Sequence, residues 1–231
     1  ACVGRCHSNY AFMYDNKTYN AATKEEVHNI ITQKEYLNNS YNVAANTTAI
    51  LTSAIQDISA FYQLAETHKS NPQEVIQQLK TSNLRGRGGA GFPFWFKLDA
   101  VIKENNEQKY IVCNADEGDP GAYSDMYLME HQPHKVLFGM YMAGLTVGAN
   151  TGVLYIRGEY PDSIKIVGEA IDELKERNLI GDFRFKIIRG QGSYVCGEET
   201  ALLSSIEGLR PEVRVRPPYP AQYGLYGKPT V

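Results

Sequence analysis

Cysteine, net charge and long apolar runs are all sparse in this chain, and each scarcity excludes a class of protein. Four cysteines in 231 residues do not make the disulfide framework of a small secreted domain. No apolar run approaches the roughly 18 residues of a membrane span, and the first residues do not form a signal peptide. The net charge of −3 gives no reason to expect a nucleic-acid partner. We therefore expect a cytoplasmic protein without direct membrane insertion, made of one ordinary globular domain and a smaller piece.

The two ends of the chain also lack familiar features. There is no initial Met, and the chain stops after Gly-Lys-Pro-Thr-Val without a terminal secondary-structure element. We expect the chain to be a fragment cut at both ends.

Glycine, in contrast, is concentrated in one informative loop between residues 84 and 98. Its glycines remove side chains where a ligand must approach the backbone closely; they are Gly86, Gly88, Gly89 and Gly91. Positive charge surrounds them, from Arg85, Arg87 and Lys97. Flat rings follow at once, at Phe92, Phe94, Trp95 and Phe96. Bare amides, cations and rings together are typical of a site for a phosphate-bearing aromatic cofactor, meaning a nucleotide or a flavin.

This loop contains the pattern G-x-G-x-x-G, but its context differs from the usual dinucleotide fingerprint, which follows a strand. The residues before it predict a helix, because Val75, Ile76 and Leu79 share one face. The sequence therefore predicts a phosphate-binding loop after a helix rather than a standard Rossmann turn. The alternative is a flexible glycine linker, although linkers favour serine and lack aromatics.

Strands alternate with helices along the chain, which predicts an α/β fold. We expect strands at 10–14, 18–19, 109–113, 152–157 and 183–188. We expect a helix after Thr23, where Glu26 completes a capping box, and further helices around 45–66, 73–82, 132–147, 161–178 and 198–206. Residues 36–43 indicate a linker, and the proline-rich tail 210–229 indicates a loop.

Polar residues follow the strand predicted at 109–113, in the order Asn114-Ala115-Asp116-Glu117-Gly118-Asp119. Ligands of open α/β sheets bind beyond the carboxyl ends of the strands. Three carboxylates there could bind a metal, act as acid and base, or accept hydrogen bonds from ribose hydroxyls. Hydroxyl recognition is favoured over a metal because no His or second acidic set accompanies them. The alternative is a solvated acidic turn.

A second polar cluster, Gly197-Glu198-Glu199-Thr200, begins a predicted helix and follows a bend at Gly190-Gln191-Gly192-Ser193-Tyr194. Carboxylates in a first helical turn are favourable for the helix dipole, so capping is one interpretation. One glutamate would suffice for capping, and the other could point at a ligand.

The four cysteines divide into two pairs. Cys113 lies in an apolar strand and Cys196 just before Gly197, and both are interpreted as small buried residues. Cys2 and Cys6 have a C-x-x-x-C spacing that can ligate one iron of a cluster, but a cluster needs four thiolates. The alternatives for this pair are a disulfide or two unrelated thiols.

Five strings in order give residues 84–230 a resemblance to the NADH-binding flavoprotein subunit of respiratory complex I, and to its relatives in soluble NAD-linked and electron-bifurcating hydrogenases and formate dehydrogenases. The strings begin at Leu84 (LRGRGGAGFP), Cys113 (CNADEGDPG), Arg157 (RGEYP), Tyr194 (YVCGEETAL) and Pro217 (PPYPA, then GKPT). The resemblance implies a Rossmann-like FMN- and NADH-binding domain at residues 72–231, truncated at its C-terminus. It also implies NADH dehydrogenase activity, with hydride transfer between NAD(H) and FMN and electrons passed to iron–sulfur clusters.

The resemblance assigns residues to the cofactor site, none of them a general base: Gly86, Arg87, Gly88, Gly89, Ala90, Phe92, Phe94, Lys97, Asn114, Asp116, Glu117, Asp119, Tyr194, Gly197, Glu198, Glu199 and Tyr219. The glycine loop would line the flavin and its phosphate, and Lys97 would pair with a flavin or nucleotide oxygen. The turn after residue 113 would hold the ribityl chain, with Asp119 near the NADH ribose. Residues 197–199 would lie at the flavin and nicotinamide. The candidates to stack on adenine are Phe92, Phe94 and Tyr219.

Residues 1–35 resemble the last part of a thioredoxin-like [2Fe–2S] domain, in which Cys2 and Cys6 would be two of the four metal ligands. Residues 36–71 would be a linker or helical segment, and the cysteines of a [4Fe–4S] cluster are expected downstream of the chain. The implied partners are other iron–sulfur subunits of a hydrogenase, formate dehydrogenase or NADH dehydrogenase complex.

Two other functions are compatible with the residues. The chain could be a non-catalytic scaffold or adaptor that keeps this fold, because Trp95 and Met126 replace a glycine and an arginine usual in the resembled family. It could instead be a metal-dependent hydrolase that uses Asp116, Glu117 and Asp119.

Overall fold

A parallel sheet forms the centre of the computed structural model, which describes residues 2–8, 10–33, 48–190 and 193–231. Its strands are β3 (Tyr110–Ala115), β4 (Thr151–Arg157) and β5 (Arg184–Gly190), paired in that order. The end of the chain extends the β3 edge, where Thr230 forms a parallel bridge to Tyr110. The predicted α/β fold is confirmed.

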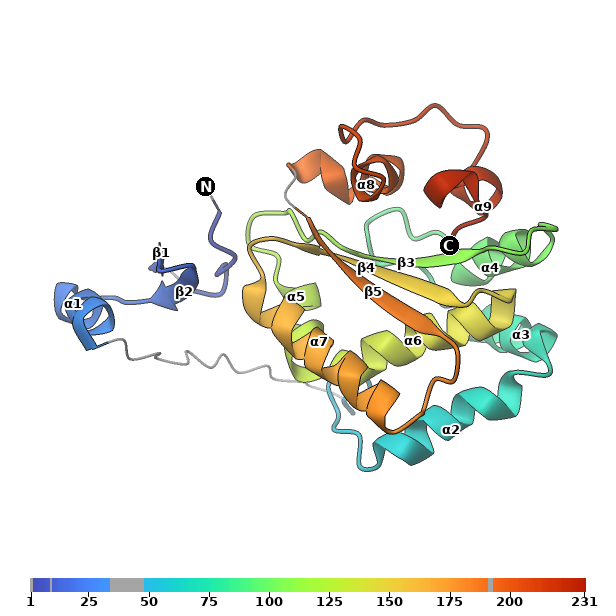
Figure 1. Ribbon diagram of the computed structural model, residues 1–231, viewed down its shortest axis with the longest axis horizontal. Coiled ribbons are helices and arrows are strands. Elements are labelled where there is room, and N and C mark those ends of the chain that lie inside the picture. The colour runs from blue at the N-terminus through green and yellow to red at the C-terminus, as the bar shows by residue number, and fades with distance from the viewer. Residues whose placement is uncertain (1, 9, 34–47, 191–192) are drawn as a thin grey trace.

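Helices cover both faces of this sheet (Figure 1). α6 (Pro133–Val147) and α7 (Pro161–Glu176) lie on one face, and α8 (Glu199–Ile206) lies on the other. The alternation of side chains along β4 explains both layers, because Leu154 and Ile156 join the core with α6 and α7. Val153 and Tyr155 point the other way and pack with Leu202 and Leu203 of α8; Tyr155 is fully buried.

The helix predicted before the glycine loop is present as α3 (Pro72–Ser82), with Asn71 as its N-cap and Pro72 in its first turn. The helices predicted at 132–147, 161–178 and 198–206 are confirmed as α6, α7 and α8. Each begins within one residue of its predicted start, because Pro133, Pro161 and the glutamate pair mark the first turns.

Two helices of eight or more residues were missed by the sequence analysis. α4 (Phe94–Ile102) begins directly after Pro93, within what the sequence presents as an aromatic loop, and it buries Leu98 and Val101. α5 (Ser124–His131) follows the acidic turn. Its first amides, of Asp125 and Met126, donate to the carboxylate of Glu117, eight and nine residues earlier. That cap is not local in sequence, so no capping pattern predicts the start of α5.

The helix predicted at 45–66 is wrong over its first part. α2 (Ile58–His68) begins only after its N-cap Asp57, and the described residues 48–57 are not helical. They are held instead by Lys135 of α6, whose Nζ donates to the carbonyl oxygens of Ile50 and Ser53, both at 2.6 Å. The linker predicted at 36–43 lies outside the described residues. The tail 210–229 is not all loop, because it contains α9 (Pro220–Tyr223) and a short 3-10 turn at Leu225–Gly227.

The N-terminal piece has the predicted strand–turn–strand–helix order. β1 (Ala11–Tyr14) and β2 (Lys17–Asn20) form an antiparallel hairpin, and α1 (Lys24–Gln33) follows. The capping box is confirmed, because the amide of Glu26 donates to Thr23 Oγ1 and the amide of Thr23 donates to Glu26 Oε2, each at 3.2 Å. This hairpin and helix stand to one side of the main body (Figure 1).

Candidate functional site

The glycine loop is fixed at its base and open at its tip. The amide of Gly86 donates to the carbonyl of Phe92 at 2.9 Å, and Arg85 donates to the carbonyl of Gly91 at 3.1 Å. A Cβ added to Gly88 or Gly89 would have no protein atom within 4 Å. The φ of Gly89 is 102°, which other residues rarely adopt. Packing within the chain therefore does not demand glycine at either position, although the backbone conformation does at Gly89. The space above the loop tip is open to a ligand.

The loop leads directly into α4, and both contribute side chains to the candidate site. Phe92 is 44% exposed, and its ring lies 6.0 Å from Nζ of Lys97 on α4. Phe94 instead packs against the main core from the first turn of α4. The exposed ring of Phe92 is thus better placed to stack on a ligand than Phe94. Tyr219, which is 56% exposed, is free to do so as well. Arg87 and Ala90 are exposed on the loop.

The acidic turn follows the carboxyl end of β3, as predicted, and its side chains diverge. Asn114 donates from Nδ2 to the carbonyl of Gly197 at 2.7 Å, which ties the turn to the segment before α8. Glu117 is buried, and its carboxylate accepts from Ser124, Met126 and Tyr160 as well as Asp125. Glu117 therefore holds the turn and the start of α5 in place. Asp116, which is half-buried, is not used for this and lies directly after β3.

Two glycines let these segments approach each other. A Cβ on Gly197 would lie 3.3 Å from the carbonyl oxygen of Asp116, and one on Gly118 would lie 3.2 Å from the ring of Tyr194. The hydroxyl of Tyr194 also interacts with the carboxylate of Asp119, which raises the tyrosine pKa. The clusters at 114–119 and 194–199, far apart in sequence, therefore meet at one edge of the sheet. Gln191 and Gly192 of the predicted bend lie outside the described residues.

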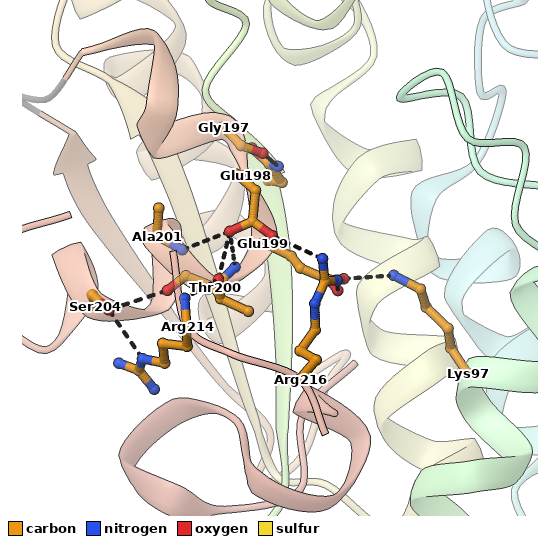
Figure 2. A network of polar contacts seen from close by, with 10 residues as sticks. Lys97, Gly197, Glu198, Glu199, Thr200, Ala201, Ser204, Arg214 and Arg216 are labelled. Atoms are coloured by element: carbon orange, nitrogen blue, oxygen red, sulfur yellow. Dashed lines mark hydrogen bonds and ion pairs between the residues drawn. The ribbon is translucent and has the colours of Figure 1, made fainter. Parts of the chain in front are cut away.

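The two glutamates before and within α8 have different surroundings (Figure 2). Glu198 is the N-cap, and its Oε2 accepts from the amides of Thr200 and Ala201 at 2.8 and 3.0 Å. Glu199 points away from the helix and forms ion pairs with Lys97, at 3.2 Å, and with Arg216. Glu198 thus caps the helix, and Glu199 presents its carboxylate to the two cations.

Arg216 is a site residue that the sequence analysis missed. Its guanidinium lies between the two glutamates, 3.6 Å from Glu198 and paired with Glu199 (Figure 2). With Lys97, it joins α4, α8 and the C-terminal tail in one network. The available signal was its place directly before the PPYP string, where a cation next to an exposed Tyr219 suits a nucleotide.

Burial shifts the ionisation of the acidic residues at this edge. It raises the pKa of Asp125 to about 6, with the charge of Glu117 adding to the effect. It also raises the pKa of Asp116, although Arg157 opposes the shift. Burial works against the charged form of Glu198 too, but hydrogen bonds from Thr200 and Ala201 outweigh it and hold that pKa below its usual value.

The expected burial of both Cys113 and Cys196 is found only in part, because Cys113 is half-buried. Cys196 is fully buried, and burial raises the pKa of the Cys113 thiol to about 12. Cys2 is exposed, Cys6 is half-buried, and both are free thiols. The amide of Gly4 donates to Cys2 Sγ at 3.4 Å. Within the described part of the chain, no three His, Cys, Asp or Glu residues are grouped so as to hold a metal ion.

Together these features define a class of protein. A parallel α/β sheet carries hydrogen-bonding carboxylates at the carboxyl ends of its strands. Lys97, from the helix that follows an open glycine loop, pairs with Glu199 beside them. That combination is characteristic of a domain that binds a phosphate-bearing flat cofactor.

Comparison with known proteins identifies the family. Residues 79–229 match the family described as the Nuo51 FMN-binding domain, and the chain belongs to that family. It is 46% identical over 168 residues to an NADH-quinone oxidoreductase subunit of Rhizobium meliloti, covering 69% of this chain and 40% of the relative. It is 46% identical over 176 residues to NADP-reducing hydrogenase subunit HndC of Solidesulfovibrio fructosivorans, covering 73% and 36%.

A solved structure extends the likeness to the N-terminal piece. The fold is similar to a chain of an NAD⁺-reducing [NiFe]-hydrogenase in its H2-reduced state, with a TM-score of 0.82 and 29% identity over 100% of this chain and 42% of that one. The chain thus spans well under half the length of the relatives it matches. None of the helices in the described ranges combines the length and the hydropathy needed to cross a bilayer.

Proposed function

We propose that this chain is the FMN- and NAD(H)-binding part of an NADH:acceptor oxidoreductase that passes electrons to iron–sulfur clusters of a larger complex. The observation that carries the proposal is the network of Lys97, Glu199 and Arg216, which stands beside an open glycine loop. The names of the relatives, which include NADH-quinone oxidoreductase and NAD-reducing hydrogenase subunits, support the same activity.

The residues present suit FMN. Because the glycines of the loop carry no side chain, a phosphate can approach their backbone amides and accept hydrogen bonds from them. Arg87 adds positive charge. Asn114 and Asp116, at the carboxyl end of β3, would form hydrogen bonds with the hydroxyl groups of a ribityl chain. When bound, the flavin supplies hydride chemistry and the conversion to single-electron steps. The chain itself binds, orients and sets the local charge.

Lys97 and Arg216 have a further task in this proposal. Each is paired with Glu199, so the site holds two cations close to one carboxylate. A negatively charged nucleotide can therefore bind by exchanging partners within the network, and no cation has to be brought in from solvent. Glu199 in turn keeps the positive charge localised at this edge.

The test uses the full-length protein and follows its visible absorbance. We expect a yellow protein that NADH bleaches without oxygen. Lys97→Gln should weaken FMN or NADH binding, whereas Lys103→Gln, just past the end of the same helix and paired with Asp99, should not. A colourless protein that takes up no FMN would support the scaffold instead. Hydrolysis that depends on a divalent metal would support the hydrolase.

The [2Fe–2S] and [4Fe–4S] clusters, and partner subunits of a hydrogenase, formate dehydrogenase or NADH dehydrogenase complex, belong to the same proposal. Cys2 and Cys6 fit half of a [2Fe–2S] ligand set, because both are free and at least partly accessible, and Cys2 already accepts a backbone N–H. We propose residues 1–35, 36–71 and 72–231 as the corresponding cluster, connecting and flavin segments.

A further inference from the structure

The cysteine segment, residues 2–6, contacts the flavin-binding domain directly at the loop that joins β4 to α7. Figure 1 shows the N-terminal segment beside the start of α7, while β1, β2 and α1 stand further from the main body. The segment that contains Cys2 and Cys6 therefore takes part in the contact between the two parts of the chain, next to His7, whose ring lies 6.0 Å from that of Tyr123.

Gly4 allows the closest approach. It is buried, its φ is +69°, and an added Cβ would collide with the carbonyl oxygen of Glu159 and lie 2.9 Å from the ring of Tyr160. Both the backbone conformation and the space require glycine here. The middle of the C-x-x-x-C segment is thus shaped to the surface of the flavin domain.

Arg5 fastens the same contact. It donates from Nε to Thr18 Oγ1 at 3.0 Å and from Nη2 to the Thr18 carbonyl at 3.1 Å. Nη2 also pairs with Asp162 Oδ2 at 3.4 Å, in the first turn of α7. The Arg5 side chain is only 11% exposed. One guanidinium therefore connects the hairpin of the N-terminal piece to a helix of the flavin domain.

Arg157 lies between this contact and the cofactor edge. It ends β4, and its buried guanidinium donates to the carbonyl of Glu117 and to Glu159 Oε2, the latter at 3.2 Å. Burial works against the cation, but the hydrogen bond and charge of Glu159 outweigh it and keep the pKa above its usual value; the charge of Cys2 adds to this. Arg157 thus stays charged between the acidic turn and the two residues that Gly4 approaches. It pairs with Glu159 at 3.2 Å, and its guanidinium carbon lies 5.1 Å from the centre of the Tyr160 ring.

We propose that Gly4, Arg5 and Asp162 dock the cysteine segment on the β4–α7 loop, and that docking brings it to Arg157, whose charge raises the reduction potential of the cluster that Cys2 and Cys6 would share. The presence of the cluster rests on the proposed function; the docking does not. An added electron makes a cluster more negative, and a nearby buried cation favours that reduced form.

The experiment compares three variants of the full-length protein. Gly4→Ala removes the close approach, and Asp162→Lys places like charge beside Arg5 without altering the cysteine segment. Gly181→Ala is the matched control, because Gly181 also has positive φ, +50°, but an added Cβ there would meet nothing within 4 Å. Hydrogen exchange of the amides at 158–163 reports docking without any redox chemistry. A redox titration of the [2Fe–2S] signal reports the potential.

We expect both docking variants to exchange faster at 158–163, by about fivefold for the loss of one ion pair and more for Gly4→Ala. We expect the cluster potential to fall in Gly4→Ala and to stay unchanged in Gly181→Ala. Asp162→Lys itself adds positive charge beside the cysteine segment, so this variant tests docking by hydrogen exchange alone. Arg5→Glu combined with Asp162→Lys should exchange more slowly than Arg5→Glu alone, because the pair is restored in reverse.

Exchange in Gly4→Ala and Asp162→Lys equal to that of Gly181→Ala would overturn the docking. If Gly4→Ala does not fold, Asp162→Lys decides. Faster exchange in Gly4→Ala with an unchanged potential would overturn the role of Arg157. A protein with a protected loop and no cluster would contradict the proposed function while leaving the docking in place.

Discussion

Gly88 offers the sharpest single-residue test of the glycine loop. Its φ is ordinary, and an added Cβ would meet no atom of the chain within 4 Å. Gly88→Ala therefore introduces neither strain nor a clash in the free protein. A bound flavin would be overpacked by about 1–3 kcal/mol, which corresponds to a loss of FMN affinity of about 5- to 150-fold.

Flavin titration and thermal unfolding measure the two effects separately. Gly139→Ala is the control, because Gly139 also has open space around it but is exposed on α6. It should raise stability by about 0.5–1 kcal/mol and leave FMN affinity alone. Equal FMN affinity in the Gly88 and Gly139 variants would show that the cofactor does not approach this loop.

Asp125 should make stability depend on pH. Its pKa is raised from 3.8 to about 6, so the folded protein holds the proton more tightly than the unfolded chain. The carboxylate therefore destabilises the fold increasingly as pH rises from about 4 to about 6. We expect Asp125→Asn to stabilise the protein at neutral pH by about 1 kcal/mol, since partial exposure and the lost charge at the start of α5 reduce the full effect.

Urea unfolding at neutral pH and near pH 4 tests this sign. The gain from Asp125→Asn should disappear at the lower pH, where the native Asp125 is itself protonated. Asp182→Asn, at an exposed carboxylate, should show no such difference. A stabilisation that is equal at both pH values would contradict the argument.

At the scale of an element, α8 divides capping and charge between neighbouring glutamates. Glu198→Gln weakens the acceptor for the amides of Thr200 and Ala201 and should cost up to about 1 kcal/mol. Because the pKa of Glu198 is lowered, its stabilisation is present at neutral pH and lost as pH falls below the ordinary carboxyl range. Glu199→Gln removes only partly exposed ion pairs and should change stability little.

In measurements on the cofactor, Glu199→Gln should have the larger effect and Glu198→Gln the smaller one. Removing the charge of Glu199 favours the anionic reduced flavin, so we expect Glu199→Gln to raise the flavin midpoint potential and to change NAD⁺ inhibition. Melting temperature, flavin potential and NAD⁺ inhibition in both full-length variants decide the matter. If both variants only melt earlier, capping accounts for the glutamate pair.

The elements that could be predicted from sequence are those whose ends are marked locally. Pro133 and Pro161 mark the starts of α6 and α7, and Thr23 with Glu26 marks α1. α5 could not be predicted, because its cap comes from Glu117 across a turn. Residues 48–57 are apolar enough to suggest a helix, but Lys135 holds their carbonyls in another conformation.

The same contrast applies to the site. The glycine loop and the two polar clusters are visible as strings, and their meeting at one sheet edge follows from the parallel topology. Glu117 is buried by its hydrogen bonds to α5, and Arg216 lies between Glu198 and Glu199. Both positions depend on contacts between segments that are separated in sequence. Such pairings are set by the folded surroundings, so a string of residue types does not specify them.

At the scale of the whole molecule, the N-terminal piece and the connecting helix are both built onto the flavin domain. Tyr62 and Ala65 of α2 belong to the same core as the helices under the sheet, and Tyr141 of α6 donates to Glu66 at 2.7 Å. The cysteine segment packs on the β4–α7 loop through Gly4. The cysteine segment thus has a defined position relative to the carboxyl ends of the sheet strands.

The cysteines provide a prediction for the complete protein. Cys2 is exposed in a segment that stands against the flavin domain, whereas Cys196 is fully buried between β4 and α8. In the full-length protein, Cys2→Ser should abolish one [2Fe–2S] signal in paramagnetic resonance, because the cluster loses a thiolate. Cys196→Ser should leave every cluster signal in place while lowering stability, since it buries a hydroxyl in an apolar cluster. Cys113→Ser is a second control, because burial keeps that thiol protonated, with its pKa raised to about 12. An unchanged spectrum in the Cys2 variant would remove this pair from the ligand set.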